Sequence, residues 1–327
     1  MGAGRSGHNR QFPIEAQPCE QQGTSAIPPL SWKRLFSAWH DGATLSFYGL
    51  LPAGRILLVI PLPSGFCVSI PVVDPSRRFG GIGRLYGAAG AAAIFRAHVA
   101  VVGIGGVGSW AAEALARSGV GQITLIDLDH VAESNINRQI HANDATLGQA
   151  KVLAMQARIA AFHPQCRVHT VDDFVDADNW PALLPEPVDA VIDACDHMAA
   201  KTAMAAWARA QKSLFITVGA AGGKQSPWLV EVDDLARATH DPLLAQLRQR
   251  LRKWHGAPRD GKAFGVASVF SRESVQHPAA TGCETTGSDG SLNCHGYGSS
   301  VTVTATFGLC AAGWVLQQLA RQAAASP

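Results

Sequence analysis

The alternation of apolar and polar positions changes near Asp74. Before this residue no helical or strand periodicity is sustained, whereas after it short apolar runs alternate with amphipathic segments, the pattern of an α/β fold. The apolar runs predict strands at 98–102, 122–127, 167–171, 188–193 and 214–218, and the amphipathic segments predict helices at 107–117, 148–162 and 199–211. This order predicts a doubly wound, mostly parallel Rossmann-like sheet with helices on both faces.

The pattern becomes less regular beyond Gly219. It predicts strands at 228–232 and 266–270, a basic amphipathic helix at 242–254, a long loop at 281–300, and an apolar helix at 301–322 that packs back on the domain. We expect one domain over 75–327, made of a nucleotide-binding core (75–224) and an irregular part (225–327) that faces the substrate and takes part in dimerisation. Residues 1–74 are expected to be a poorly ordered or lineage-specific extension.

The composition is that of a globular protein in a reducing compartment. Of the 327 residues, 47% are apolar and 16% are charged. A formal net charge of +2 neither requires nor excludes a nucleic-acid partner. The seven cysteines are scattered and form no Cys-x-x-Cys pair, which argues against a disulfide scaffold and against a four-cysteine zinc site. We therefore expect a cytoplasmic protein.

The first 73 residues lack the features of a secretory signal or a membrane span. Residues 1–28 are polar, without a continuous apolar stretch. Residues 45–73 are apolar but are interrupted by Pro52, Arg55, Pro61, Pro63 and Pro71, whereas a spanning helix needs about 20 mostly apolar residues. No firm membrane partner is expected, and peripheral association with a membrane stays open.

A glycine-rich turn follows the first predicted strand of the core. Gly103, Gly105 and Gly108 satisfy G-x-G-x-x-G between a strand and a helix, and Gly106 stands among them. Such glycines permit a tight turn, close approach of the backbone to phosphate, and packing of the helix on the strand. Asp127 ends the next strand, where a carboxylate would accept a ribose hydroxyl. On these residues alone, an NAD-dependent oxidoreductase would be the favoured function. The alternative without function is a tight glycine turn that binds no ligand.

Charged side chains further along the chain favour ATP over NAD. A triphosphate attacked at its α-phosphate needs cationic side chains and a metal, whereas backbone amides largely suffice for the pyrophosphate of NAD. The chain places polar and charged residues at the carboxyl ends of the predicted strands or in the adjoining connections: Asn137, Arg138, Gln139, Lys151, Asp193 and Asp196. Each alone could be an ordinary surface residue. Their joint position on one sheet edge, where open α/β sheets bind ligands, favours an ATP site.

These stretches resemble the ubiquitin-activating-enzyme-like adenylating superfamily. The resemblance rests on G-x-G-G-x-G at 103–108, Asp-Leu-Asp at 127–129, Asn-Arg-Gln at 137–139, G-x-x-K at 148–151 and D-x-x-D at 193–196. It implies a ThiF-type adenylation fold with ATP and Mg²⁺ as cofactors. It also implies that Asp127 holds the ribose, that Asn137, Arg138 and Lys151 contact the phosphates, and that Asp196 carries Mg²⁺. The remaining implied nucleotide-binding residues are Gly103, Gly105, Gly106, Gly108, Asp129, Gln139 and Asp193.

The resemblance further implies a homodimer in which an arginine near the start of the domain reaches into the partner's site. Arg84, in the stretch RFGGIGRLYG (78–87), is the matching residue. Within the superfamily the chain is similar to the branch of tRNA threonylcarbamoyladenosine dehydratases. The matching stretches are RFGGIGRLYG, VVGIGGVGSWAAEALARSGVG (101–121), NRQIHA (137–142), VDDFV (171–175), GAAGG (219–223), DPLLAQLRQRLR (241–252) and VTATFG (303–308). Ser268 departs from the branch, in which a cysteine often stands there.

This branch implies an activity and a partner. The activity is ATP-dependent dehydration, by cyclisation, of N6-threonylcarbamoyladenosine at position 37 of tRNA, through adenylation of the threonyl carboxylate. A tRNA partner needs a cationic surface. The chain offers Arg248, Arg250, Arg252 and Lys253, with Arg237, Arg259, Lys262 and Arg272 nearby and Trp254 and His255 adjoining. A solvated basic helix face is the alternative interpretation. A cysteine desulfurase or another sulfur-acceptor system, and a monovalent cation, stay open as further components.

Three other functions stay open at this point. An NAD-linked oxidoreductase would leave Arg138, Lys151 and Asp196 without a purpose. An adenylyltransferase that activates a ubiquitin-like sulfur carrier would need a protein partner with a Gly-Gly tail, and such enzymes typically carry the Cys-x-x-Cys pairs missing here. A non-catalytic protein that binds RNA or a partner would have no need of the charged groups at the nucleotide site.

Overall fold

The computed structural model describes residues 16–18, 46–51, 55–59, 66–71, 74–276 and 297–325, with side chains from residue 74 onward. The chain forms two compact units, Met1–Arg78 and Phe79–Pro327. The predictions of an extension over 1–74 and of a long loop over 281–300 fall largely outside the described residues.

The first unit contains a small antiparallel sheet that the sequence analysis did not predict. Its order is β1-β4-β3-β2, with β1 at Ala16–Pro18, β2 at Ser46–Leu51, β3 at Arg55–Val59 and β4 at Phe66–Pro71. The prolines in this region made the strands difficult to predict from hydrophobic periodicity. They lie at strand ends, because Pro71 is the last residue of β4 and Pro52 directly follows β2. In a sheet, proline is tolerated at strand ends and edges.

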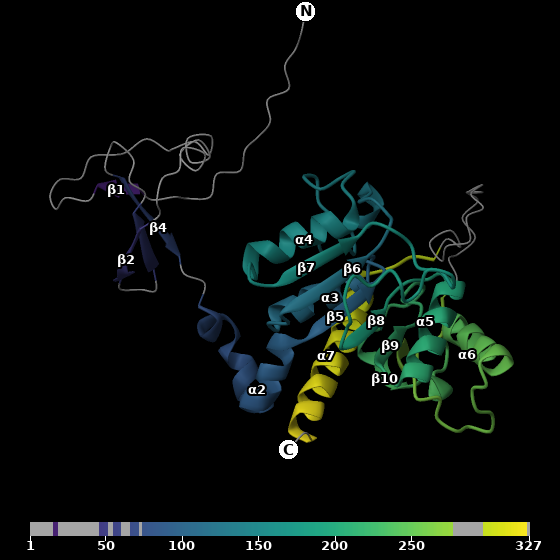
Figure 1. Ribbon diagram of the computed structural model, residues 1–327. Helices are drawn as coiled ribbons and strands as arrows, with labels where there is room; N and C mark the ends of the chain where they lie inside the picture. The colour runs from purple at the N-terminus through teal and green to yellow at the C-terminus, as the bar shows by residue number, and fades with distance from the viewer. Residues whose placement is uncertain are drawn as a thin grey trace, which may run out of the picture. The chain divides into compact units, whose positions relative to one another are not determined.

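The second unit is built on a seven-stranded sheet of order β10-β11-β9-β8-β5-β6-β7 (Figure 1). Its strands are β5 (His98–Val102), β6 (Gln122–Ile126), β7 (Arg167–Val171), β8 (Ala190–Asp193), β9 (Leu214–Val218), β10 (Val230–Asp234) and β11 (Ala267–Ser271). Neighbouring strands are parallel except β10, which runs antiparallel to β11. The predicted doubly wound, mostly parallel fold is confirmed.

The strand order reverses between β5 and β8. The chain passes from β5 to β6 and β7 on one side, then crosses to β8 and β9 on the other. The last residue of β5, Val102, is therefore paired with Ile126 of β6 and with Asp193 of β8. Ligands of open α/β sheets bind at such a reversal, beyond the carboxyl ends of the strands.

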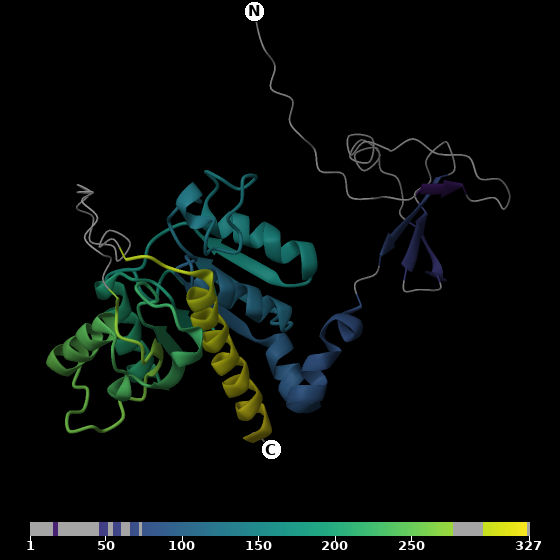
Figure 2. The same cartoon turned by 180° about the vertical axis from the view of Figure 1, so that it is seen from behind.

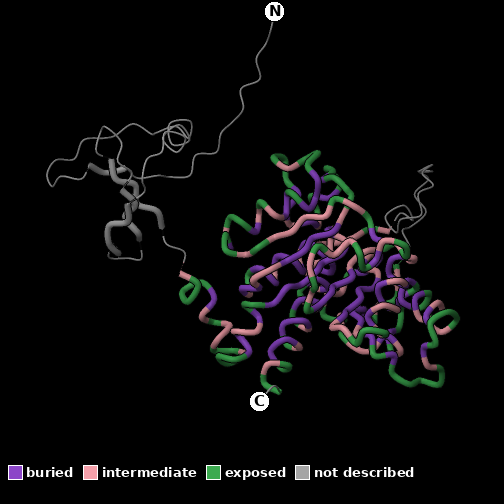
Figure 3. The backbone as a smooth tube through the Cα atoms, viewed as in Figure 1, coloured by how far each residue is buried: buried purple, intermediate pink, exposed green. Residues whose placement is uncertain are grey.

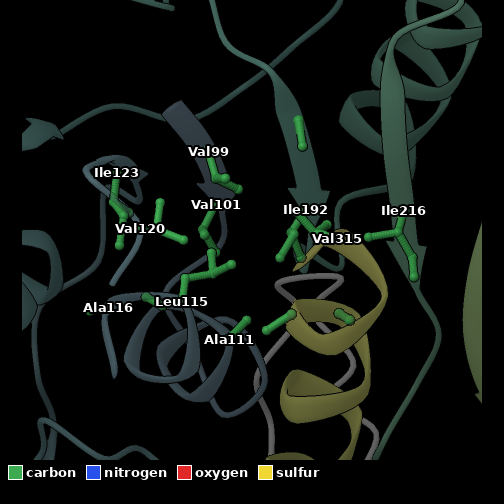
Figure 4. Close-up of a cluster of buried hydrophobic side chains, with 14 of the residues drawn as sticks. Val99, Val101, Ala111, Leu115, Ala116, Val120, Ile123, Ile192, Ile216 and Val315 are labelled. Atoms are coloured by element: carbon green, nitrogen blue, oxygen red, sulfur yellow. The ribbon is translucent and has the colours of Figure 1, made fainter. Parts of the chain in front are cut away.

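Helices cover both faces of this sheet. They are α2 (Pro75–Arg96), α3 (Gly108–Arg117), α4 (Lys151–Phe162), α5 (Met198–Gln211), α6 (Pro242–Trp254) and α7 (Val301–Ala325), with 3₁₀ turns η1 (Glu133–Asn135), η2 (Pro227–Leu229) and η3 (Leu235–Arg237). Successive strand residues point to opposite faces. Thus Val99 and Val101 pack with α3, α4 and α7, whereas Ala100 and Val102 pack with α5 and α6. Figure 4 shows the first cluster, and Figure 3 shows the buried backbone through the centre of the unit.

The helix α2 was missed because glycines at 80, 81, 83, 87 and 90 lower helix propensity over its length. At Gly87 the backbone is not helical (φ 74°, ψ 170°), so α2 consists of two helical segments joined by a kink. Phe79 and Ile94 anchor them in the core. Gly90 allows α2 to approach α7 closely, since a Cβ there would lie 3.0 Å from the Cβ of Ala320.

The C-terminal helix α7 is long and apolar enough to cross a membrane by length and composition. In the described part of the chain, however, it packs along α3 and against β9 (Figure 2). Val303, Phe307, Ala311 and Val315 are fully buried along one side of it. A Cβ at Gly308 would overlap with the carbonyl oxygen of Val107, so glycine is required where the two helices meet. The prediction of a C-terminal helix packed back on the domain is confirmed.

Candidate functional site

A cavity of about 620 Å³ opens at the carboxyl edge of the sheet, where the strand order reverses. This volume is in the range of small-molecule sites, roughly 300–1,000 Å³. Nine residues of the predicted site line it: Gly103, Gly105, Gly106, Asp127, Asp129, Arg138, Gln139, Lys151 and Asp196. Four others, Gly108, Asn137, Asp193 and Arg84, do not. The structure also adds lining residues that the sequence analysis did not select, namely Asp173, Phe174, His197, Tyr297, Ser299 and Thr304.

The glycine turn between β5 and α3 forms one wall of the cavity. Gly103 has a positive φ of 85°, and a Cβ there would lie 2.8 Å from the backbone of Ala194 and Cys195. A Cβ at Gly108 would overlap with the carbonyl oxygen of Gly103. At Gly105, no atom of the described residues lies within 4 Å of the position of a Cβ, so this part of the turn leaves space for a ligand. No side chain caps α3, and although the Ser109 N–H donates to Gly105 O (3.1 Å), the N-terminal end of the helix still presents its positive dipole end toward the cavity wall.

Two carboxylates and one ammonium group meet at the end of β6. The carboxylate of Asp127 accepts hydrogen bonds from the backbone N–H groups of Ile104 and Asp129. Lys151 Nζ lies 2.6 Å from Asp129 Oδ2 and 3.9 Å from Asp127 Oδ1. Burial raises the pKa of Asp127, against the effect of Lys151 and the two N–H groups. The first residue of α4 thus places a buried cation between carboxylates suited to bind ribose hydroxyls.

Residues 137–139 follow η1 and bring a guanidinium group to the glycine turn. Arg138 Nη1 donates to Ser134 O (2.7 Å) and to Asn137 Oδ1 (2.9 Å), and the Trp110 indole donates to Arg138 O (2.9 Å). A Cβ at Gly106 would lie 3.2 Å from the Arg138 side chain, so this glycine makes room for it. Burial lowers the pKa of Arg138. Arg138 is therefore held in place, with a partly desolvated charge beside the glycine turn.

The amides on either side of Arg138 have different surroundings. Asn137 Nδ2 donates to Ser299 O (3.1 Å), so Asn137, which does not itself line the cavity, holds the backbone of a residue that does. Gln139 is buried and lines the cavity. Its Oε1 atom has no hydrogen-bond partner among the described residues. Gln139 is the lining side chain that most needs a donor from a ligand, because an unpaired buried carbonyl costs about 1–3 kcal/mol.

Asp193 and Asp196, three residues apart in the sequence, have different environments. Asp193 is fully buried and accepts hydrogen bonds from Thr217 Oγ1 (2.6 Å) and Cys195 N (3.3 Å). Lys201 is also fully buried, and its Nζ lies 3.0 Å from Asp193 Oδ2, the oxygen that also accepts the hydrogen bond from Thr217. The structure therefore does not support the predicted direct contact of Asp193 with nucleotide, since its oxygens are occupied beneath the cavity. Asp196 is exposed and lines the cavity.

Lys201 was missed by the sequence analysis. It lies in α5, among alanines and methionines, and its only signal was a charged residue within an apolar helical segment five positions after Asp196. Arg84 is exposed on α2 and does not line the cavity of its own chain. Ser268 is buried and donates to Asp233 O (3.0 Å), away from the cavity. Burial raises the pKa of Cys195 well above its ordinary value, so its thiol is a poor nucleophile.

The predicted basic cluster on α6 separates into two groups. In the first group, four arginines are held by neighbouring groups. Arg248 donates to Leu235 O and Ala238 O, and Arg252 donates to Pro258 O. Arg237 pairs with Asp233, and Arg272 pairs with Glu231. The second group surrounds Trp254, which is 56% exposed. Arg250 Cζ lies 5.5 Å and Lys253 Nζ lies 5.0 Å from its ring centroid. Trp254 and Lys253 are exposed and Arg250 is partly exposed, so the three side chains form an aromatic and cationic surface, and Lys253 also lines a groove of about 530 Å³.

Comparisons with known proteins agree with this geometry. The model of the ThiF family matches residues 81–325. The chain is 43% identical over 265 residues to a tRNA threonylcarbamoyladenosine dehydratase of Escherichia coli (strain K12), covering 79% of this chain and 99% of the relative. It is 40% identical over 261 residues to the protein of that name from Haemophilus influenzae, again covering 79% and 99%.

Solved structures give the same result. The E. coli tRNA N6-threonylcarbamoyladenosine dehydratase in complex with ATP is similar with a TM-score of 0.70 and 42% identity, covering 79% of this chain and 100% of that one. Its complex with AMP gives a TM-score of 0.69 and 43% identity, with 77% and 100% covered. Family match, identity and coverage together establish that the chain belongs to the ThiF family of adenylating enzymes.

Proposed function

We propose that this protein uses ATP to dehydrate N6-threonylcarbamoyladenosine in tRNA to its cyclic form. One observation carries the proposal: the anion-binding turn, Arg138, Lys151 and Asp196 line a single cavity at the switch point of the sheet. Two relatives, each covered to 99% of its own length by this chain, are named after this activity. The NAD-linked alternative gives no role to these charged groups and does not fit the ThiF family.

The proposed reaction has two steps. The threonyl carboxylate attacks the α-phosphate of ATP, which gives an acyl-adenylate and releases pyrophosphate. The neighbouring carbamoyl group then attacks the acyl carbon, loses a proton and expels AMP, which carries away the carboxylate oxygen. The net result is the loss of one water from the substrate, and no external nucleophile is needed. This agrees with the raised pKa of Cys195, the thiol that lines the cavity.

The chain's own groups position the reactants and stabilise charge. The N-terminus of α3 and the open backbone at Gly105 bind phosphate oxygens, and Arg138 and Lys151 neutralise charge that develops at the α-phosphate. Asp127 and Asp129 orient the ribose. Asp196 would hold Mg²⁺, which supplies charge neutralisation to the departing pyrophosphate. A single exposed carboxylate fits this ion, because Mg²⁺ is usually held by one or two carboxylates together with substrate phosphates.

Mass spectrometry of the product tests this function. The protein is incubated with ATP, Mg²⁺ and tRNA that contains threonylcarbamoyladenosine, and unmodified tRNA serves as the control. We expect a modified adenosine lighter by one water, with release of AMP and pyrophosphate. ATP consumption only in the presence of a Gly-Gly-tailed carrier protein would instead support a sulfur-carrier-activating enzyme, and hydride transfer would contradict both.

The dimer also belongs to this proposal. Arg84 is exposed and lies outside its own cavity, as expected of a residue that serves a partner's site. The mass of one chain is 34.4 kDa, and we expect sedimentation equilibrium to give twice this mass. A monomer in solution that retains full activity would exclude a role for Arg84 in the partner's site.

The surface around Trp254 is the proposed contact for tRNA. The first turn of α6 borders the cavity through Leu243, and Trp254 lies eleven residues further along the same helix, or about 16 Å. We expect Arg250→Ala with Lys253→Ala to weaken tRNA binding about tenfold and to lower the salt dependence of binding by up to about two phosphate contacts. Fluorescence anisotropy at several salt concentrations measures both. An equal loss in the control Arg96→Ala with Arg167→Ala would show only a net-charge effect.

Two glycine substitutions separate phosphate binding from folding. Gly105→Ala adds a methyl group with no protein atom within 4 Å, so we expect an unchanged Tm but ATP binding weakened at least about tenfold, because the methyl occupies the path of the phosphate. Gly108→Ala overlaps with the carbonyl of Gly103 and is expected to lower stability by about 1–3 kcal/mol. Thermal unfolding and calorimetric titration with ATP measure the pair. Normal ATP binding by Gly105→Ala would exclude this turn as the phosphate site.

A further inference from the structure

A buried ion pair, Asp193 with Lys201, lies next to the segment that carries Asp196, one of the carboxylates that line the cavity. Asp193 and Lys201 are both fully inaccessible to solvent, and Lys201 Nζ lies 3.0 Å from Asp193 Oδ2. Such pairs are seldom kept for stability, because desolvation of two charges offsets most of their attraction. A positioning role therefore explains this pair better than a contribution to stability does.

Both members of the pair hold the backbone of the same residue, Cys195. Asp193 Oδ1 accepts a hydrogen bond from Cys195 N (3.3 Å), and Lys201 Nζ donates to Cys195 O (2.9 Å). The carbonyl of Cys195 belongs to the peptide bond that precedes Asp196. The backbone leading to Asp196 is thus fixed from both sides by one ion pair.

The peptide group between Ala194 and Cys195 also lies against the glycine turn. A Cβ at Gly103 would lie 2.8 Å from Ala194 O and from Cys195 N, so the glycine turn rests on the backbone that the pair fixes. Thr217 Oγ1 donates to Asp193 Oδ2 (2.6 Å) and completes the set of partners from β9. Three elements, β8, β9 and α5, therefore control the relative position of the phosphate turn and Asp196.

We propose that Lys201 is a positioning residue, which acts through Asp193 and the Cys195 carbonyl to place Asp196 for the metal–ATP complex. This inference rests on the proposed function. Because Lys201 neutralises Asp193, Asp196 is the carboxylate of this turn whose charge is left to face the cavity. Groups that orient a metal ligand without touching the metal typically change metal affinity 10–100-fold when they are removed.

The test uses the full chain and two forms of the substitution. Lys201→Met alone leaves the buried Asp193 carboxylate without its cation and is expected to unfold at a lower temperature. Asp193→Asn with Lys201→Met removes both charges and keeps the side-chain volumes close to the original. Lys224→Met is the matched control, since Lys224 is also a buried lysine but donates to the backbone carbonyls of His240, Ser271 and Glu273.

Two measurements are made on each folded variant. Binding of Mn²⁺ to the complex with a non-hydrolysable ATP analogue is followed by electron paramagnetic resonance, and binding of the analogue without metal is followed by calorimetry. For the double variant we expect metal affinity about tenfold lower or more, with metal-free binding of the analogue within about threefold of the original. Lys224→Met should keep the original metal affinity.

The outcomes separate this inference from the proposed function. A folded double variant that binds Mn²⁺ as the unmodified protein does would overturn the positioning role and leave the pair a structural one. Equal losses in the double variant and in Lys224→Met would overturn it as well. Failure of the unmodified protein to bind the analogue at all would instead contradict the proposed function.

Discussion

Replacing Arg138 by alanine is expected to slow ATP–pyrophosphate exchange by a factor on the order of 10²–10³. The guanidinium group lies beside the glycine turn, held by Ser134 O and Asn137 Oδ1, with its alkyl chain against Gly106. A donor fixed in this way stabilises charge that grows at the α-phosphate without having to reorganise during the reaction. Its loss should therefore lower the rate constant much more than the affinity for ATP.

The measurement is isotope exchange between pyrophosphate and ATP in the presence of substrate tRNA, with Tm recorded for each variant. Arg138→Lys should recover only part of the rate, because an ammonium keeps the charge but loses the planar pair of donors. Arg167→Ala is the control, since Arg167 pairs with Glu186 at the start of β7, at the opposite edge of the sheet. An exchange rate for Arg138→Ala within about threefold of the original would remove Arg138 from the mechanism.

The core strands could be predicted because each is a short apolar run of a parallel sheet buried on both faces. Val99, Val101 and Ile192 fill one face and Ala100 and Val191 the other, so the periodicity is nearly continuous and easy to detect. The position of the site followed from the same pattern, because polar residues that follow parallel strands meet at one edge.

Other features could not be predicted because they depend on tertiary contacts. The start of α4 was placed three residues early, and Gly148 has a positive φ of 78° that local propensity does not reveal. Asp193 and Asp196 look equivalent in sequence. Asp193 is buried because β8 pairs with β9 and α5 places Lys201 against it, whereas Asp196 remains exposed. Lys201 was missed for the same reason, since its partner lies eight residues away on another element.

The residues of the site indicate the kind of nucleotide, but they do not identify the acceptor of the adenylyl group. A glycine turn at a switch point shows where a phosphate binds, and it is common to all dinucleotide-binding folds of this type. Arg138 and Lys151 line the same cavity, and under the proposed function their charges favour a triphosphate under attack over a bound dinucleotide. The acceptor, a modified tRNA base, depends on the similarity to named relatives, and the exposed surface at Trp254 gives it an independent physical test.

Replacing Asp196 by asparagine is expected to reduce the exchange rate on the order of 10²–10³ at millimolar Mg²⁺, while changing Tm little. Asparagine has the size of aspartate but lacks its charge, and Asp196 is exposed at the cavity, so the fold has no need of that charge. The deficit should shrink as Mg²⁺ is raised, which Arg138→Ala should not show, because only the first variant weakens a metal ligand.

Exchange rates measured over a range of Mg²⁺ concentrations distinguish the two variants. Asp173→Asn is the matched control, because Asp173 also lines the cavity but its Oδ1 accepts the N–H of Phe174, at the end of the sheet beyond β7. We expect that control to keep the original Mg²⁺ dependence. If Asp196→Asn also kept it, the metal would be held elsewhere, and the positioning role of Lys201 would fail together with the metal role of Asp196, because both act on the same carboxylate.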